Sequence, residues 1–344
     1  MSFFQLSIFY AITLAFTISI FFNRVLISFA TNYKKKNIKN EKRLSDKNIP
    51  PYGGVATSFA FFIATIFLGR ADPAFMTIGI CAFIISVIGI IDDIYNLEWK
   101  IKLLFQILII LYPLIALDIF INIEAFLNQD LQNVLNIVIS LIWVIVIINS
   151  INFIDNMDGL TVFVSGSICL QISLLSNYSN IYKVTDISLL LLATLLGFLI
   201  YNYPPARLYF GDSGTLFVGY VLGFISIIFD WIPLDNGILN SPLSPVLFIF
   251  VVPILDFTVV TTHRIRNNVS PTQGGTDHIS HRLLNIGYSE KKVLLEFLFV
   301  SFIFYCLLIG TISFSGFLSY LFASLYLIFF IFSFLRYRKL EPLS

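Results

Sequence analysis

The sequence Asn152-Phe-Ile-Asp-Asn-Met-Asp-Gly-Leu160 directly follows a long uncharged, mostly apolar run and opens into a second apolar run. Two carboxylates, Asp155 and Asp158, and two amides, Asn152 and Asn156, therefore stand at the end of a hydrophobic segment. A carboxylate beside an apolar wall is costly unless a metal ion, an opposite charge or water holds it. A polar turn rich in Asn and Gly would also explain the stretch, but a functional site is the favoured interpretation.

Around this stretch, composition assigns most of the chain to a membrane. Of its 344 residues 58% are hydrophobic and only 12% charged, about half the charged share of a typical soluble domain. Apolar windows of membrane-spanning length predict an all-α polytopic membrane protein with about eleven transmembrane helices, ten being the alternative count. The windows cover residues 3–25, 53–69, 73–91, 101–117, 134–151, 160–176, 186–202, 213–231, 243–262, 293–313 and 316–335.

The basic residues predict the orientation of these helices. A block of seven Lys and Arg side chains between residues 34 and 47 follows the first window and should remain cytoplasmic. Eleven spans then leave only Arg70 and Lys183 of the 21 basic residues outside. We therefore expect the N-terminus outside, the C-terminus in the cytoplasm, and residues 1–344 to form a single domain in the cell inner membrane. The net charge of +1 gives no reason to expect a nucleic-acid partner.

The same topology brings three more polar segments to the inner face, with active-site loops near 92–102, 152–159, 202–214 and 263–292. Asp92 and Asp93 end one span, where adjacent acids oppose the helix dipole and favour a nearby cation. In the next segment Gly211 and Gly214 flank Asp212 and would permit close approach of a ligand to the backbone. A solvated helix end and an ordinary N-cap are the simpler alternatives for these acids.

The last segment, 263–292, holds the three histidines of the chain. His278 and His281 would share one face of a short helix, and Arg282 can fork onto phosphate oxygens. Zinc is disfavoured because no cysteine is near, and the carboxylates elsewhere suit a hard, oxygen-preferring ion better. Asp256, inside a predicted span, is expected to have a supporting role.

Carboxylates, a basic loop and glycine turns at one membrane face suit phosphoryl transfer with a metal ion. At these residues the chain resembles the polyprenyl-phosphate N-acetylhexosamine-1-phosphate transferases. The resemblance rests on Gly53-Gly54, Asp92-Asp93, Asn152 to Gly159, Phe210-Gly-Asp-Ser-Gly214 and the histidine loop. It implies Mg²⁺ (or Mn²⁺) as cofactor and a UDP-N-acetylhexosamine and undecaprenyl phosphate as substrates in the bilayer, and it leaves a homodimer open.

The resemblance also implies residue roles. Asp212 would be the main metal ligand, helped by Asp155 and Asp92. Catalytic roles fall on six residues: Asp92, Asp93, Asp155, Asp158, His278 and His281. Substrate-binding roles fall on seven: Lys100, Lys102, Asn152, Asn156, Tyr209, Gly211 and Arg282. Tyr209 would stack on uracil, and the two lysines would lie near the phosphates.

The histidine loop departs from the family pattern in one place. Ser280 stands where the family usually has a middle histidine, and Asp277 directly precedes His278. The consecutive histidines of the phospho-MurNAc-pentapeptide branch are missing, which favours a GlcNAc-type donor. The expected reaction is attack of the lipid phosphate on the β-phosphorus of the UDP-sugar, with UMP leaving; a two-step path through a covalent aspartyl intermediate is the alternative.

Two other functional classes are weaker predictions. A transporter would place polar residues near mid-bilayer and often shows two related halves, whereas here the clusters lie at one face and no repeat is visible. A CDP-alcohol phosphatidyltransferase needs Ala-Arg after its Asp-Gly pair. Here Asp158-Gly159 is followed by Leu160-Thr161.

Overall fold

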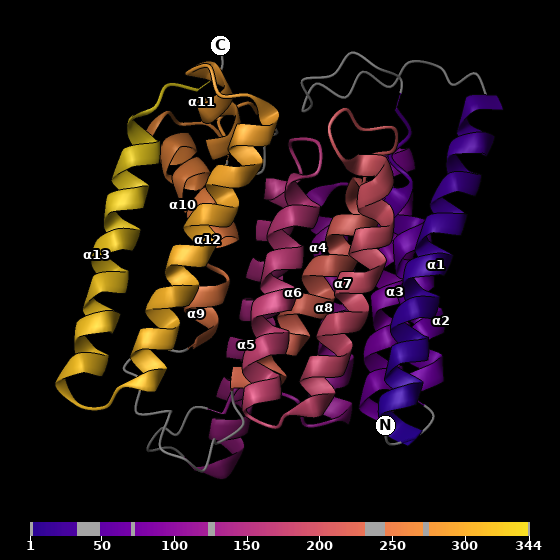
Figure 1. The fold of residues 1–344 in the computed structure, drawn as a ribbon, viewed down its shortest axis with the longest axis horizontal. Coiled ribbons are helices and arrows are strands. Elements are labelled where there is room, and N and C mark those ends of the chain that lie inside the picture. The colour runs from indigo at the N-terminus through magenta and orange to yellow at the C-terminus, as the bar shows by residue number, and fades with distance from the viewer. Residues whose placement is uncertain are drawn as a thin grey trace.

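The computed structural model describes residues 3–32, 49–69, 73–122, 128–230, 245–270 and 275–342. Across these ranges all regular secondary structure is helical (Figure 1), which confirms the all-α prediction. The helices are α1 (Phe3–Asn32), α2 (Gly53–Gly69), α3 (Pro73–Tyr95), α4 (Trp99–Ala116), α5 (Gln129–Ile154), α6 (Leu160–Tyr178), α7 (Tyr182–Asn202), α8 (Gly211–Asp230), α9 (Pro245–Ile249), α10 (Val251–Arg266), α11 (Ile279–Asn285), α12 (Glu290–Ser313) and α13 (Phe317–Lys339). The basic block 34–47 and Arg70 lie outside the described residues.

Nine helices of the described chain are long and apolar enough to cross a membrane, and α2 is a shorter apolar helix. Helices suit lipid because they satisfy every backbone hydrogen bond internally. The chain is therefore a multi-pass membrane protein.

The window predicted at 243–262 contains two helices in the described residues, with an irregular residue between them. α9 ends at Ile249, and α10 begins at Val251 after Phe250 (φ −89°, ψ 10°). Pro253 lies in the first turn of α10, where its missing N–H removes no intrahelical hydrogen bond. A hydropathy window averages over such a break and does not detect it.

Helix α8 is the centre of the bundle and packs against α2, α3 and α5. In its most apolar window 89% of the residues are buried, against 17% in α1 and 22% in α13, which lie at the periphery. Gly219 and Gly223 face α5 so closely that a methyl group at Gly219 would lie 2.6 Å from Ile148 Cα. Small residues at this spacing let membrane helices approach each other.

The segments predicted to share one face do lie at one end of the bundle. In Figure 1 the α5–α6 and α7–α8 connections and α11 are at the end where the chain terminates, and α1 begins at the opposite end. We call this the polar end of the bundle. Its assignment to the cytoplasm stays a prediction.

Candidate active site

A lysine joins two of the predicted acids at the polar end. Lys102 Nζ, from the first turn of α4, lies 2.7 Å from Asp92 Oδ2 at the end of α3 and 2.7 Å from Asp212 Oδ2 at the start of α8. The Lys102 side chain is only 17% exposed. Three helices thus bring two carboxylates onto one cation, which offsets the cost of placing these charges at the membrane boundary.

Asp93 has a different environment from its neighbour. Its two carboxylate oxygens accept hydrogen bonds from the backbone N–H groups of Asp212 (2.9 Å) and Ser213 (3.2 Å). These are among the N–H groups that a helix start leaves unpaired, and the helix dipole favours an anion there. Asp93, which belongs to α3, therefore caps the start of α8. The Asp212 side chain, considered as an N-cap in the sequence, instead contacts Lys102 and Asn152.

Two glycines permit this close arrangement. Gly211 has φ +73°, and a Cβ there would lie 2.3 Å from Pro51 O and 2.7 Å from Asp93 Oδ2. A Cβ on Gly89 of α3 would lie 2.4 Å from Ser213 Cα. Gly211 therefore serves the local backbone, as its conformation requires, and contact with a substrate stays a prediction for it.

Asn152, in the last turn of α5, binds the other oxygen of Asp212. Its amide Nδ2 donates to Asp212 Oδ1 (2.8 Å) and to Thr215 Oγ1 (2.7 Å). Both oxygens of Asp212 thus have a donor, Lys102 on one and Asn152 on the other. This connects the quoted stretch directly to the acid–lysine cluster.

The turn after α5 is tied to the turn before α8. Asp155 accepts a hydrogen bond from Thr161 Oγ1 (2.9 Å), and Asp158 accepts one from the backbone N–H of Ala206 (2.8 Å). Asn202, which the sequence did not single out, accepts from Gly159 N at 3.0 Å and donates to Leu208 O at 2.9 Å. The sequence feature that could have identified Asn202 is its position two residues before the paired prolines 204–205.

Asn156 links this turn to the histidine loop. Its Oδ1 accepts a short hydrogen bond from Ser280 Oγ, and its Nδ2 donates to Phe153 O at 2.9 Å. Both Asn156 and Ser280 are buried. The residue that departs from the family pattern therefore fixes α11 to the α5–α6 turn.

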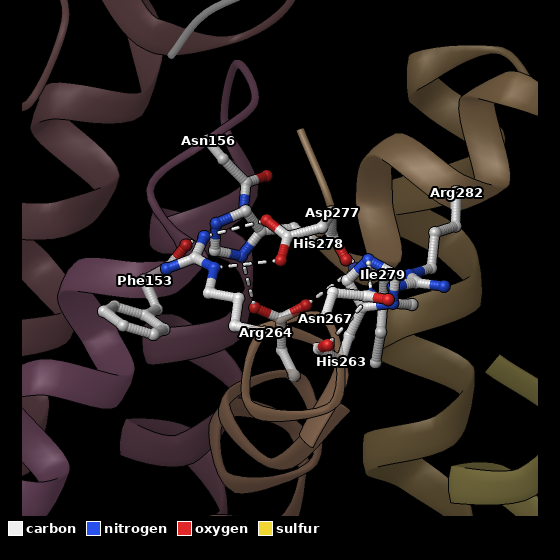
Figure 2. Close-up of polar contacts among 10 residues, drawn as sticks. Phe153, Asn156, His263, Arg264, Asn267, Asp277, His278, Ile279 and Arg282 are labelled. Atoms are coloured by element: carbon white, nitrogen blue, oxygen red, sulfur yellow. Dashed lines mark hydrogen bonds and ion pairs between the residues drawn. The ribbon is translucent and has the colours of Figure 1, made fainter. Parts of the chain in front are cut away.

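The histidine loop is held by a bidentate ion pair that the sequence did not reveal. Arg264, in the last turn of α10, donates from Nε and Nη2 to the two oxygens of Asp277 at 2.9 and 2.8 Å. Figure 2 shows this pair beside the ring of Phe153, whose centroid lies 5.5 Å from the guanidinium carbon. Burial alone would raise the pKa of Asp277, but Arg264 outweighs it and holds that pKa below its usual value. Asp277 therefore has a structural partner in this loop.

The two predicted histidines lie together, with ring centroids 6.1 Å apart. His278 is the N-cap residue of α11 and bonds through Nδ1 to Asp256 Oδ2 at 2.8 Å. His281 is fully buried, and neither ring nitrogen has a hydrogen-bond partner among the described residues. Burial, reinforced by nearby His278, lowers the pKa of His281 to about 4. His281 is therefore neutral at pH 7.

Three predicted substrate-binding residues have surroundings that the sequence did not show. Arg282 is 1% exposed and donates to the backbone oxygens of Asp277 and Leu340. Tyr209 is 3% exposed. The Lys100 side chain is 68% exposed and pairs with Glu98 at 3.8 Å. Contact with a substrate stays a prediction for all three.

No group of three or more His, Cys, Asp or Glu side chains within the described ranges is arranged to hold a metal ion. The acid–lysine cluster nevertheless suits Mg²⁺ chemically. One carboxylate oxygen of Asp92 and one of Asp212 each lie 2.7 Å from the ammonium group of Lys102, so both point at the same positive charge. Magnesium is commonly held by one or two carboxylates together with water and substrate phosphates.

Comparison with known proteins identifies relatives of the chain. Residues 75–230 match the model of the family described as glycosyl transferase family 4. The chain is 31% identical to a probable undecaprenyl-phosphate N-acetylglucosaminyl 1-phosphate transferase of Bacillus subtilis, over 77% of this chain and 74% of the relative. It is 31% identical to a decaprenyl-phosphate N-acetylglucosaminephosphotransferase of Mycolicibacterium smegmatis, over 64% and 59%. It is 26% identical to a phospho-N-acetylmuramoyl-pentapeptide-transferase of Orientia tsutsugamushi, over 86% and 90%.

Proposed function

Because the chain belongs to glycosyl transferase family 4, we propose that it transfers an N-acetylhexosamine-1-phosphate from a UDP-sugar to undecaprenyl phosphate. The products are a lipid-linked sugar diphosphate and UMP. The observation that carries the proposal is the acid–lysine cluster, in which Asp92, Lys102 and Asp212 meet at the polar end of the bundle. A site at the end of membrane helices is accessible to both a lipid-borne phosphate and a water-soluble nucleotide.

Asp92 and Asp212 are the residues proposed to hold Mg²⁺, with Asp155 in the adjoining turn. The ion, when bound, neutralises charge on the diphosphate and on the departing UMP. Lys102 supplies a fixed positive charge beside the same oxygens. Asn152 holds the Asp212 carboxylate in a single orientation through Oδ1.

The reaction is an attack by a lipid phosphate oxygen on the β-phosphorus of the sugar nucleotide. The bond from that phosphorus to the bridging oxygen breaks, and UMP leaves with the electron pair. We assign removal of any proton from the lipid phosphate to one of the adjacent acids, Asp92 or Asp93. Both carboxylates have hydrogen-bond donors: Asp93 accepts two backbone N–H groups at a helix N-terminus, and Asp92 lies 2.7 Å from Lys102 Nζ.

GlcNAc-1-phosphate is the proposed transferred group. Two relatives named above are N-acetylglucosamine phosphotransferases, and the chain lacks the consecutive histidines of the pentapeptide branch. UDP-MurNAc-pentapeptide is the second candidate donor, because relatives of that branch align over a larger share of the chain. The proposed setting is the cell inner membrane, with the polar end facing the cytoplasm.

The test is UMP release by the purified protein with undecaprenyl phosphate, Mg²⁺ and a panel of UDP-sugars that includes both candidate donors. Wild-type protein should release UMP with UDP-GlcNAc, and Asp212→Asn should lower kcat by about a thousandfold or more while the protein remains folded. Asp130→Asn is the matched control, because it makes the same chemical change at the exposed start of α5. Near-normal turnover by Asp212→Asn would remove Asp212 from the mechanism, and no UMP with any donor would refute the function.

A further inference from the structure

Asp256 is a fully buried carboxylate in α10. Burying a carboxylate costs free energy unless hydrogen bonds or an opposite charge compensate for the lost water, so the groups that contact Asp256 stabilise it. Both partners come from the start of the histidine loop helix: Oδ2 lies 2.8 Å from His278 Nδ1, and Oδ1 accepts from the backbone N–H of Ile279 at 2.7 Å. One side chain thus holds both the first turn of α11 and the imidazole that precedes it.

The hydrogen-bond roles determine which nitrogen of His278 carries a proton. An ionised carboxylate only accepts hydrogen bonds, so Nδ1 must be the donor to Asp256. In the neutral ring the proton is then on Nδ1, and Nε2 is left with a lone pair. Other charged or titratable groups around the ring are Arg264, Asp277 and His281, and Arg264 and Asp277 are already paired with each other.

Contact with Phe153 also fixes the orientation of the His278 ring. His278 meets the ring of Phe153 edge-on, with centroids 5.8 Å apart and planes at 85°. Phe153 belongs to the last turn of α5, one residue after Asn152, which binds Asp212. The histidine is therefore held against the same helix end that orients the proposed metal ligand.

We propose that Asp256 is a positioning residue that holds His278 in the Nδ1–H tautomer, so that Nε2 keeps a lone pair that accepts a hydrogen bond from a donor group of the substrates, a sugar hydroxyl or a protonated phosphate oxygen. The hydrogen bond to Nε2 rests on the proposed function, whereas the tautomer does not. The tautomer follows from the Asp256 geometry alone. The two parts can therefore fail separately.

The decisive variant is Asp256→Asn. Its Oδ1 can still accept from Ile279 N, which preserves the start of α11. Its Nδ2 is a donor, so His278 Nδ1 must become the acceptor and the proton moves to Nε2. Loss of the correct tautomer at an otherwise intact site lowers kcat by orders of magnitude in the serine protease case. We expect kcat to fall at least a hundredfold with KM for the sugar nucleotide changed less than about threefold.

The tautomer is read directly by ¹⁵N NMR of protein labelled at histidine. The chain has only three histidines, so His263→Gln and His281→Asn variants assign the spectrum. In the wild type at pH 8, His278 should show Nδ1 protonated and Nε2 unprotonated. In Asp256→Asn the pattern should reverse, and in the control Asp130→Asn it should be unchanged.

Several outcomes would overturn the proposal. A wild-type His278 with its proton on Nε2 would do so without any variant. Reversal of the tautomer with full activity would remove the functional part. Loss of activity in Asp256→Asn with the tautomer retained would leave Asp256 a purely structural role. If the wild type released no UMP from any UDP-sugar, the proposed function would fail while the tautomer measurement would still stand.

Discussion

Replacement of Lys102 by Met tests the acid–lysine cluster most directly. Met keeps the length of the side chain and removes its charge. The change leaves two carboxylates side by side without the ammonium that now lies 2.7 Å from each. The substitution should therefore destabilise the helix contacts of α3, α4 and α8 as well as abolish turnover.

The size of the effect follows from burial. The Lys102 side chain is 17% exposed, and those of Asp92 and Asp212 are 9% and 33% exposed. Removing one partner of a buried ion pair costs roughly 3–5 kcal/mol. Because Asp212 is one-third exposed, we take the lower end, about 3 kcal/mol, which corresponds to a fall in melting temperature on the order of 5 °C.

The assay is thermal unfolding of the purified protein in detergent, with EDTA or with millimolar Mg²⁺. Mg²⁺ should restore part of the lost stability in Lys102→Met, because two unpaired carboxylates attract a hard cation. Lys339→Met, at the exposed end of α13, is the control and should melt like the wild type in both conditions. A Lys102→Met protein that melts within about 1 °C of the wild type, with or without Mg²⁺, would refute the claim that this lysine holds the acids together.

Two further predictions concern α11 and the α3–α8 contact. The pKa of His281 is lowered to about 4 by burial, whereas the unfolded ring titrates near 6.5, so its stabilising contribution is complete above pH 6.5 and is lost as pH falls toward 4. Unfolding measured between pH 7 and 4 should show this loss, up to about 3 kcal/mol, in the wild type and not in His281→Leu; an unchanged profile in that variant would contradict it. Gly89→Leu should destabilise the protein by more than about 2 kcal/mol, because even a Cβ at this position would lie 2.4 Å from Ser213 Cα. The matched control is Gly166→Leu, since a Cβ on this helical glycine would lie 3.4 Å from Leu192. Equal melting temperatures for the two variants would count against the contact.

The sequence was sufficient to predict helices that span a membrane, because lipid imposes a local rule. A spanning segment must be apolar and must satisfy its own backbone hydrogen bonds, and both properties can be read from about twenty consecutive residues. The same regularity, with the positions of Lys and Arg, grouped the polar segments at one end of the bundle. The α5–α6 and α7–α8 connections and α11 lie there (Figure 1), and Lys102 joins the α3–α4 segment to Asp212. The break at Phe250 was missed because a single residue of irregular backbone barely changes an average over such a window.

Only the tertiary structure decided which polar group binds which. Asp92 and Asp93 are neighbours with nearly equal prospects in the sequence, yet one binds a lysine side chain and the other caps a helix that begins more than a hundred residues later. Asp256 and His278 find each other because α10 and α11 pack together, not because of their spacing. The physical reason is that a hydrogen bond depends on distances of tenths of an ångström between distant segments, and those distances are set by close packing such as that of Gly89 on Ser213. Residue types fix what chemistry a chain can perform, and helix packing fixes which of its groups perform it.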